Sequence, residues 1–285
     1  MKNIFALFLI VAFSISISAH IIPNSEKSVL IKLYQSTNGN QWRVKWDLKA
    51  PISSWHGIKI QHDHVVGINL SNNNLVGTLP VELTELEHLE VLDLFINQIS
   101  GTIPETIGNL KSLKELNLSF NMLSGTIPNS ICEIPNLKVL CIFTNNLSGE
   151  LPSEIGNLKE LEILSLLYNG LSGKLPVSLY QLKNLKDLLL SNNKFSGSIS
   201  PSIENMKELE NLTLSNNKMN GEIPFNMVKL EKLQNLNLSF NSFSGTVPKA
   251  LAEKKDFDLT MKNELEQSYL LEVIDNAKVG VVVDE

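Results

Sequence analysis

The sequence is poor in cysteine and in long apolar runs. Only two cysteines, Cys132 and Cys141, occur in 285 residues, which excludes a scaffold held together mainly by disulfides. After the first 19 residues, which are discussed below, no stretch approaches 18 consecutive apolar residues. We therefore expect no membrane span in residues 20–285. The formal net charge is -6, which gives no electrostatic reason to expect nucleic acid or an anionic membrane as a partner.

Sequence patterns of catalysis are also missing. No Ser/His/Asp arrangement, phosphate-binding loop or paired-carboxylate cleft stands out. The densest titratable cluster is His62, Asp63 and His64, with His56 nearby. His62 and His64 would share a face of a strand, as metal ligands can, but a solvated edge is the simpler interpretation. We therefore expect no enzyme activity, no cofactor and no metal site.

The first nineteen residues differ from the rest of the chain. Lys2 precedes an apolar stretch from Ile4 to Ile17, and the small residues Ser18 and Ala19 follow. This order is typical of a secretory signal peptide, with an uncleaved anchor as the alternative. We therefore expect a secreted protein, at the cell surface or in the extracellular medium.

The main feature that is present is a repeat of 24 residues. An asparagine recurs at this spacing eight times without insertion or deletion. A glycine stands four positions after each asparagine, and a proline stands seven positions after it in seven cases, with Ser200 as the exception. The eight asparagines are Asn73, Asn97, Asn121, Asn145, Asn169, Asn193, Asn217 and Asn241.

Each recurring position of the repeat has a physical reason. Aliphatic residues five and three positions before the asparagine, such as Leu92 and Leu94, alternate with a period of two, which predicts a short strand with one buried face. The asparagine amide can bond to backbone groups that the following turn leaves unpaired, in its own coil and the next, so we expect a structural ladder. Apolar residues such as Ile107 and Leu110 would close the coil with a helical turn.

The segments ISGTIP (99–104) and LSGELP (147–152) resemble the plant-type 24-residue subclass of the leucine-rich-repeat family. The resemblance covers residues 65 to about 250. It implies an α/β solenoid, a right-handed superhelix of eight coils with a parallel sheet on the concave side. The family's members act as receptor ectodomains, inhibitors of secreted enzymes, or adhesion and scaffold modules.

Segments outside the repeat should cover its two ends. We expect a signal peptide at 1–19, an N-terminal cap at 20–64, the solenoid at 65–250, and a C-terminal cap or tail at 251–285. All three tryptophans lie in the N-terminal cap, which lacks the cysteine pair of standard plant receptors. Residues 259–277 are expected to form an amphipathic helix.

The candidate binding surface lies in the middle of the concave sheet. Residues six, four and two positions before each asparagine should point into solvent, and in the middle repeats many of them are apolar. An exposed apolar patch is typical of a binding surface, although these residues could also simply pack against one another. The predicted partner-binding residues are Val91, Phe95, Val139, Cys141, Phe143, Ile163, Leu167 and Leu189.

The sequence therefore predicts a non-catalytic recognition or scaffold module for a protein or peptide ligand. A secreted inhibitor of a foreign hydrolase, a polysaccharide binder and an ice binder are the alternatives. The threonine row Thr78, Thr102 and Thr126 supports ice binding, but Glu150 and Lys174 interrupt it.

Two further expectations concern covalent chemistry. Cys132 should lie on the outer segment and Cys141 on the concave strand, too far apart for a disulfide, so we expect two free thiols. Five Asn-x-Ser/Thr triplets occur, but Asn-Leu-Ser belongs to the repeat itself. The five asparagines are Asn69, Asn117, Asn146, Asn211 and Asn237.

Overall fold

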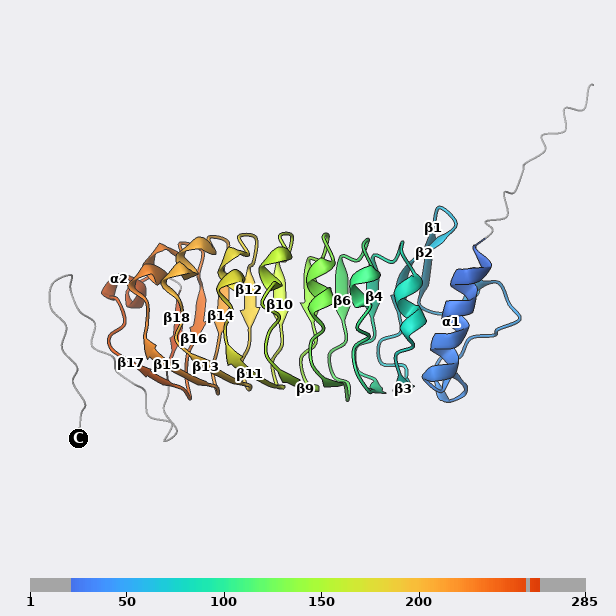
Figure 1. Ribbon diagram of the computed structural model, residues 1–285, viewed down its shortest axis with the longest axis horizontal. Helices are drawn as coiled ribbons and strands as arrows, with labels where there is room; N and C mark the ends of the chain where they lie inside the picture. The colour runs from blue at the N-terminus through green and yellow to red at the C-terminus, as the bar shows by residue number, and fades with distance from the viewer. Residues whose placement is uncertain (1–21, 255–256, 262–285) are drawn as a thin grey trace, which may run out of the picture.

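The chain forms an elongated stack of coils, seen side-on in Figure 1. The computed structural model describes residues 22–254 and 257–261. The expected signal peptide therefore lies outside the described residues. Helix α1 (Asn24–Ser36) covers the N-terminal end of the stack, and the short helix α2 (Lys249–Ala252) lies near the other end.

One long sheet runs along the stack. Its first two strands, β1 and β2, are antiparallel, and every later strand is parallel to its neighbour. The strands of each coil are in register, so residues 24 positions apart lie side by side, as Leu92 does beside Leu116. In spatial order the ten strands are β1 (Ile58–Gln61), β2 (His64–Asn69), β4 (Val91–Asp93), β6 (Glu115–Asn117), β8 (Val139–Cys141), β10 (Ile163–Ser165), β12 (Asp187–Leu189), β14 (Asn211–Thr213), β16 (Asn235–Asn237) and β18 (Asp258–Thr260).

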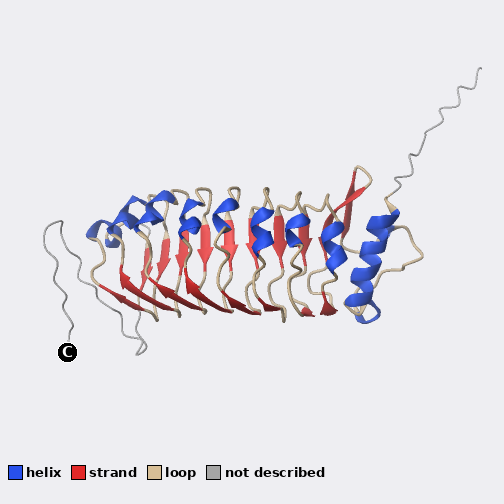
Figure 2. Cartoon of the chain, viewed as in Figure 1, coloured by secondary structure: helices blue, strands red, loops and turns tan. Residues whose placement is uncertain are grey.

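A second row of short parallel strands follows the asparagines and runs along the lower edge of the stack in Figure 2. These strands lie in the segment that reads Leu-Ser-Gly in the third to fifth coils. The row consists of β3 (Val76–Thr78) with β5 (Gln98–Ser100), and of β7 (Ser124–Gly125), β9 (Asn146–Gly149), β11 (Gly170–Lys174), β13 (Lys194–Gly197), β15 (Lys218–Glu222) and β17 (Ser242–Ser244).

Short 3₁₀ turns close the coils on the side opposite the long sheet, where Figure 2 draws them as blue ribbons. Aliphatic side chains from strands, flank and turns meet inside the stack in one continuous core. The expected helical turns are therefore present as 3₁₀ turns. They span Val81–Glu85, Ile107–Asn109, Asn129–Glu133, Ile155–Asn157, Val177–Gln181, Pro201–Asn205 and Phe225–Lys229.

The repeated asparagines form a hydrogen-bonded ladder inside the stack. Asn97 Nδ2 donates to Leu94 O of its own coil and to Leu70 O of the preceding coil, both at 2.9 Å. Its Oδ1 accepts from Leu75 N at 2.9 Å. The same pattern recurs at Asn121 and at the later ladder positions. The side chain thus joins its coil to the preceding one, not to the next as the sequence suggested.

The Leu-Ser-Gly segments connect successive coils along the flank. Ser124 Oγ donates to Gly101 O at 3.3 Å, and Ser148 Oγ donates to Gly125 O at 3.4 Å. At Gly149 the backbone has φ +80°, and an added Cβ would lie 2.8 Å from Thr126 Cγ2. Both the left-handed conformation and the close approach require glycine there.

Ser200, which replaces the repeated proline, has a specific partner. Its backbone N–H, which proline would lack, donates to Tyr180 Oη at 3.1 Å. Its hydroxyl also accepts from Ser202 N at the start of the next 3₁₀ turn. The Tyr180 ring is buried, so the exception in the repeat satisfies the polar atom of a core aromatic residue.

An aromatic cluster covers the N-terminal end of the core. Tyr34 of α1 packs against Trp42 and Trp46, and Trp46 stacks on Trp55 with ring centroids 4.7 Å apart. Each indole N–H donates to a backbone carbonyl at 2.9 Å. The three tryptophans are therefore buried and each has its indole N–H satisfied.

The asparagine ladder extends into the N-terminal cap. Asn73 Oδ1 accepts from Val44 N at 2.7 Å, and its Nδ2 donates to Val44 O. Glu26 of α1 is buried and accepts from Val65 N at 2.7 Å, which anchors the helix to β2. The cap is therefore joined to the first coil by the same kind of bond that joins the coils to one another.

The C-terminal end continues the repeat further than the sequence suggested. Strand β18 pairs in parallel with β16, so Leu259 and Thr260 are in a strand and not in the expected helix; residues 262–277 lie outside the described residues. Lys254 replaces the core aliphatic of the repeat. Its Nζ donates to Leu230 O, Glu231 O and Leu233 O at 2.6–2.9 Å, and burial lowers its pKa.

Candidate binding surface

The eight predicted partner-binding residues all lie on the concave side of the long sheet. Each of them is partly exposed, neither buried in the core nor fully in solvent. They are less solvated than the sequence suggested, because side chains on neighbouring strands partly cover one another.

The register determines which of these residues meet. Val139 of β8 lies beside Ile163 of β10, and Cys141 lies beside Ser165. Val91 is separated from Val139 by Glu115 of β6, which pairs with both. Leu189 of β12 lies beside Ser165. The apolar positions are therefore concentrated on β8 and β10, with Val91 and Leu189 at a distance from that centre.

Phe120, which the sequence reasoning missed, connects two of the predicted residues. Its ring lies 5.5 Å from that of Phe95 and 5.3 Å from that of Phe143, both in edge-to-face geometry. The corresponding concave position of its own coil is Ser119, a small and buried residue. The rings of Phe95 and Phe143 lie 6.2 Å apart, so the three phenylalanines of neighbouring coils form a triangular cluster.

The residue before each ladder asparagine adopts the left-handed conformation. Its φ lies between 52° and 60° in all eight coils. Three coils use asparagine, which tolerates this region, whereas the second to fifth coils have Ile96, Phe120, Thr144 and Tyr168, and the eighth has Phe240. Bulky residues in this region carry strain, so a local cost accompanies the display of these side chains.

These positions form a rim between the concave sheet and the flank. Ile96, Phe120 and Tyr168 are 44%, 46% and 58% exposed. A bulky apolar residue directly before the asparagine was a visible signal in the sequence. We define the apolar patch as the concave and rim residues that cluster in the second to fifth coils: Phe95, Ile96, Phe120, Val139, Cys141, Phe143, Ile163, Leu167 and Tyr168.

A hollow of about 490 Å³ adjoins the patch where Gly170 leaves the flank without a side chain. Tyr168, Asn146, Asn192 and Lys194 are among the residues that line it. Asn146 is exposed on this flank, whereas the other four asparagines of the Asn-x-Ser/Thr triplets lie on the strands of the long sheet. Glycosylation of any of them stays a prediction.

Both cysteines are free thiols, as the repeat predicts. Cys132 lies in the 3₁₀ turn Asn129–Glu133 and Cys141 in β8. Burial, together with the charges of Glu154 and Glu133, raises the pKa of Cys132 to about 12. Burial and the charges of nearby carboxylates raise the pKa of Cys141 to about 11.

The histidine pair considered as metal ligands is not on one strand face. His62 and Asp63 form the turn between β1 and β2, with φ of 50° and 65°. His64 Nδ1 lies 2.7 Å from Glu26 Oε1, and its ring contacts that of His88 at a centroid distance of 3.7 Å. Within the described residues, no group of three or more His, Cys, Asp or Glu could hold a metal ion.

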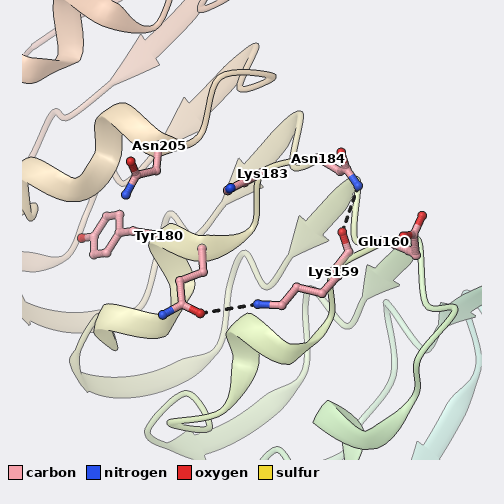
Figure 3. Close-up of a pocket in the computed structure, with 7 residues that line it drawn as sticks. Lys159, Glu160, Tyr180, Lys183, Asn184 and Asn205 are labelled. Atoms are coloured by element: carbon pink, nitrogen blue, oxygen red, sulfur yellow. Dashed lines mark hydrogen bonds between the residues drawn. The ribbon is translucent and has the colours of Figure 1, made fainter.

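A second hollow, of about 640 Å³, lies on the outer face near the fourth to sixth coils (Figure 3). The Lys159 ammonium points toward Gln181 Oε1, at 3.4 Å, and Asn184 Nδ2 donates to Lys159 O at 3.0 Å. These bonds join successive coils. The polar groups that line the hollow thus serve the stacking of the solenoid, which makes it a weaker candidate than the apolar patch.

The row considered for ice binding has the broken character expected from the sequence. Thr78, Thr102 and Thr126 are exposed on the flank, and the exposed Glu150 and Lys174 follow in the next coils. The neighbouring serine hydroxyls donate to glycine carbonyls.

Among residues 22–254 and 257–261, no helix is long and apolar enough to cross a membrane.

Comparison with known proteins identifies the repeat. The family model "Leucine-rich repeat region" matches residues 128–256, and models of single or grouped leucine-rich repeats match residues 88–147 and 64–86. A probable leucine-rich-repeat receptor-like serine/threonine-protein kinase of Arabidopsis thaliana is 33% identical over 90 residues. That match covers 31% of this chain and 15% of the kinase.

Solved plant proteins share the fold. The leucine-rich-repeat ectodomain of the receptor kinase GASSHO1/SCHENGEN3 from Arabidopsis thaliana, in complex with CASPARIAN STRIP INTEGRITY FACTOR 2, is 29% identical with a TM-score of 0.78. The match covers 84% of this chain and 30% of the receptor chain. The Arabidopsis HAESA ectodomain, in complex with a peptide hormone, is 33% identical with a TM-score of 0.75 and coverages of 84% and 41%.

A plant ice-binding protein has a TM-score of 0.68 at 22% identity, with 85% and 86% of the two chains covered. This likeness extends to the fold alone.

The chain spans less than half of the length of the two receptor ectodomains and a smaller share of the kinase. The fold it shares with the ectodomains is one used to bind ligands. With repeat models matching residues 64–86 and 88–256, and with eight coils in register, the chain belongs to the leucine-rich-repeat family, in its plant-type subclass.

Proposed function

We propose that this chain is a secreted, non-catalytic recognition module that binds a protein or peptide through the apolar patch. The observation that carries the proposal is the Phe95–Phe120–Phe143 cluster, which lies partly exposed on the concave side. Aromatic residues supply much of the binding energy at protein interfaces because they remove a large apolar area from water.

The backbone of the rim supports the proposal. Ile96, Phe120 and Tyr168 occupy a conformation that asparagine would adopt with less strain, and asparagine does occupy it in three other coils. Stability alone would therefore favour asparagine in the second, third and fifth coils. Strained and exposed apolar residues at one place in a fold are typical of a functional surface.

The comparisons support the same kind of partner. The GASSHO1/SCHENGEN3 and HAESA ectodomains were solved with bound ligands, in the second case a peptide hormone. Both solved structures are ectodomains, the extracellular parts of their receptors. We therefore also propose an extracytoplasmic location for this chain.

The test is selection from a random peptide library displayed on phage. The selection would use the protein and its variant with Phe95→Ser, Phe143→Ser and Leu167→Ser. We expect the protein to enrich a set of peptides that the variant binds at least tenfold more weakly, since each side chain contributes apolar contact area.

A matched control removes the same number of exposed apolar residues from the outer face. Val81, Val177 and Phe225 are 55%, 71% and 60% exposed there. The variant with serine at these three positions should bind the selected peptides as the unchanged protein does. Equal binding by both serine variants, with both folded by circular dichroism, would show that the patch is not the site.

A further inference from the structure

The concave side carries charge of one sign. The positions six, four and two before the eight ladder asparagines include three acidic residues, Asp93, Glu115 and Asp187, and no lysine, arginine or histidine. All three carboxylates lie on strands that contribute to the apolar patch or border it, namely β4, β6 and β12. The surface proposed to bind a partner is therefore both apolar and acidic.

The three acidic residues lie on either side of Val139 and Ile163, the strand residues at the centre of the patch. Glu115 pairs with Val139, and Asp93 lies on the next strand outward from the centre. Asp187 pairs with Ile163 on the other side. Three strand spacings separate β6 from β12, which corresponds to about 14 Å. Val139 and Ile163 lie in the interval between the carboxylates.

The nearby lysines do not neutralise these carboxylates. At the beginnings of the strands Lys114 pairs with Glu90 at 2.9 Å, and Lys138 and Lys186 pair with Glu162 at 3.4 and 2.7 Å. Within the described part of the chain, no ion pair joins a basic residue to one of the three concave acids.

Two of the acids accept hydrogen bonds, in both cases from groups that carry no charge. Asp93 Oδ1 accepts from Phe95 N at 3.1 Å, and Asp187 Oδ1 accepts from Asn211 Nδ2 at 2.5 Å. The raised pKa of Cys141, at the centre of the patch, is caused first by burial and then by the charges of Asp187, Asp93 and Glu115. The negative potential of the three carboxylates thus converges on the apolar centre.

We infer that the partner is an extended segment in which two basic side chains, four residues apart, flank an apolar one. An extended chain rises about 3.3 Å per residue, so four residues span the roughly 14 Å between Glu115 and Asp187. Residues i, i+2 and i+4 project from the same face, so the basic side chains would meet the carboxylates while the apolar one contacts Val139 and Ile163. This inference rests on the proposed function and adds the chemistry of the partner.

The experiment adds a charge variant to the peptide selection. Asp93→Asn, Glu115→Gln and Asp187→Asn remove the concave charge with little change in shape. We expect the unchanged protein to select peptides enriched in Arg or Lys at i and i+4 around an apolar residue. The charge variant should lose this basic enrichment while it still selects apolar peptides.

Synthetic peptides give the quantitative readout. A peptide with Arg at i and i+4 and Phe at i+2 should bind at least tenfold more tightly than the same peptide with Glu at i and i+4. Raising the salt from about 0.05 to 0.5 M should reduce this difference, because exposed charge pairs are screened. A control variant with Glu87→Gln, Glu105→Gln and Glu160→Gln loses the same net charge from exposed positions outside the concave sheet, and should behave as the unchanged protein.

The outcomes separate the two proposals. Peptides that require the apolar patch but show no basic enrichment, or that bind the charge variant equally well, would overturn the charge inference and leave the proposed function standing. Selected peptides that bind the Phe95, Phe143 and Leu167 serine variant unchanged would overturn the proposed function itself. A preference for acidic peptides would contradict the charge inference directly.

Discussion

The residue before each ladder asparagine shows how a single position can serve both fold and surface. In every coil its backbone is left-handed, and in the first seven coils its amide bonds to the following coil, as Ile96 N does to Ser119 O at 3.1 Å. The side chain is free to vary because it points to the rim. The conformation is therefore imposed by the stack, while the residue type is available for recognition.

Because the stack imposes the left-handed backbone whatever the residue type, we predict that asparagine at a rim position makes the fold more stable than a bulkier residue does. Ile96→Asn and Thr144→Asn should each raise the free energy of unfolding by about 1 kcal/mol, because asparagine tolerates φ near 55° better than a β-branched residue. Urea unfolding followed by circular dichroism measures the change. Thr126→Asn is the control, since Thr126 is exposed on the flank at an ordinary φ and should change stability by less than about 0.5 kcal/mol. A loss of stability in both rim variants would contradict the strain argument.

The two thiols predict a pH dependence. An ordinary thiol with a pKa of 9.0 is about one-tenth ionised at pH 8, whereas Cys141, with a pKa of about 11, is ionised to about one part in a thousand. Native Cys141 should therefore react with iodoacetamide about 100-fold more slowly than a free peptide thiol. Mass spectrometry after timed alkylation measures this rate, with the urea-unfolded protein as the reference. A native rate equal to the unfolded rate would contradict the raised pKa.

The same shifts determine how stability changes with pH. Because the folded pKa values of Cys132 and Cys141 lie above 9.0, folding favours the protonated thiols. Their contribution is complete below about pH 9 and is lost as the pH rises through 11 and 12. Urea midpoints measured from pH 8 to 11 should therefore fall at the alkaline end.

At the scale of elements, helix α1 depends on one buried carboxylate for its attachment to the sheet. Glu26 Oε2 accepts from Val65 N and Oε1 contacts His64 Nδ1, both at 2.7 Å. Glu26→Ala should cost about 1–3 kcal/mol, because it leaves the buried Val65 N–H without its partner. Urea unfolding measures the loss, and Glu87→Ala at an exposed position should change little. Equal midpoints for the two variants would show that the carboxylate does not hold the cap.

Elements that belong to the repeat could be predicted from the sequence, and elements outside it less well. The eight strands and helical turns followed from aliphatic spacing, since each coil repeats the same side-chain environment. Strand β18 was missed because Lys254 stands where the pattern requires an aliphatic residue, and its ammonium is instead satisfied by three carbonyls. His62 was wrongly placed on a strand because nothing in its residue type indicates a two-residue turn.

The candidate surface was predicted only in part for a related reason. Alternation identified the side chains that leave the strand on the concave side, such as Phe95 and Phe143. It could not identify Phe120, whose ring contacts both of them only because the stack holds its backbone in the left-handed region. The position of a side chain beyond the end of a strand depends on the turn, which a period of two does not describe.

At the scale of the whole molecule, each coil contacts only its neighbours, so a defect should act differently in the middle and at the end. Asn145 and Asn241 make equivalent bonds: each donates to three carbonyls and accepts one backbone N–H from the preceding coil. Replacement by alanine leaves these groups unpaired in both cases, at a cost of about 3 kcal/mol or more where they are buried. Because each coil contacts only its neighbours, the effect of losing one ladder asparagine on the rest of the fold depends on how many coils lie on either side of it.

Asn145→Ala should therefore divide the stack into two weaker halves and lower hydrogen-exchange protection in the coils on both sides of it. Asn241→Ala should increase exchange mainly beyond Leu214, while the coils between Ile68 and Leu140 keep their protection, because opening of the last coils leaves the rest of the core intact. Hydrogen exchange followed by mass spectrometry of peptides from each coil distinguishes the two patterns. Identical exchange profiles for the two variants would mean that the solenoid unfolds as a single cooperative unit, and that the ladder couples coils over a longer range than nearest neighbours.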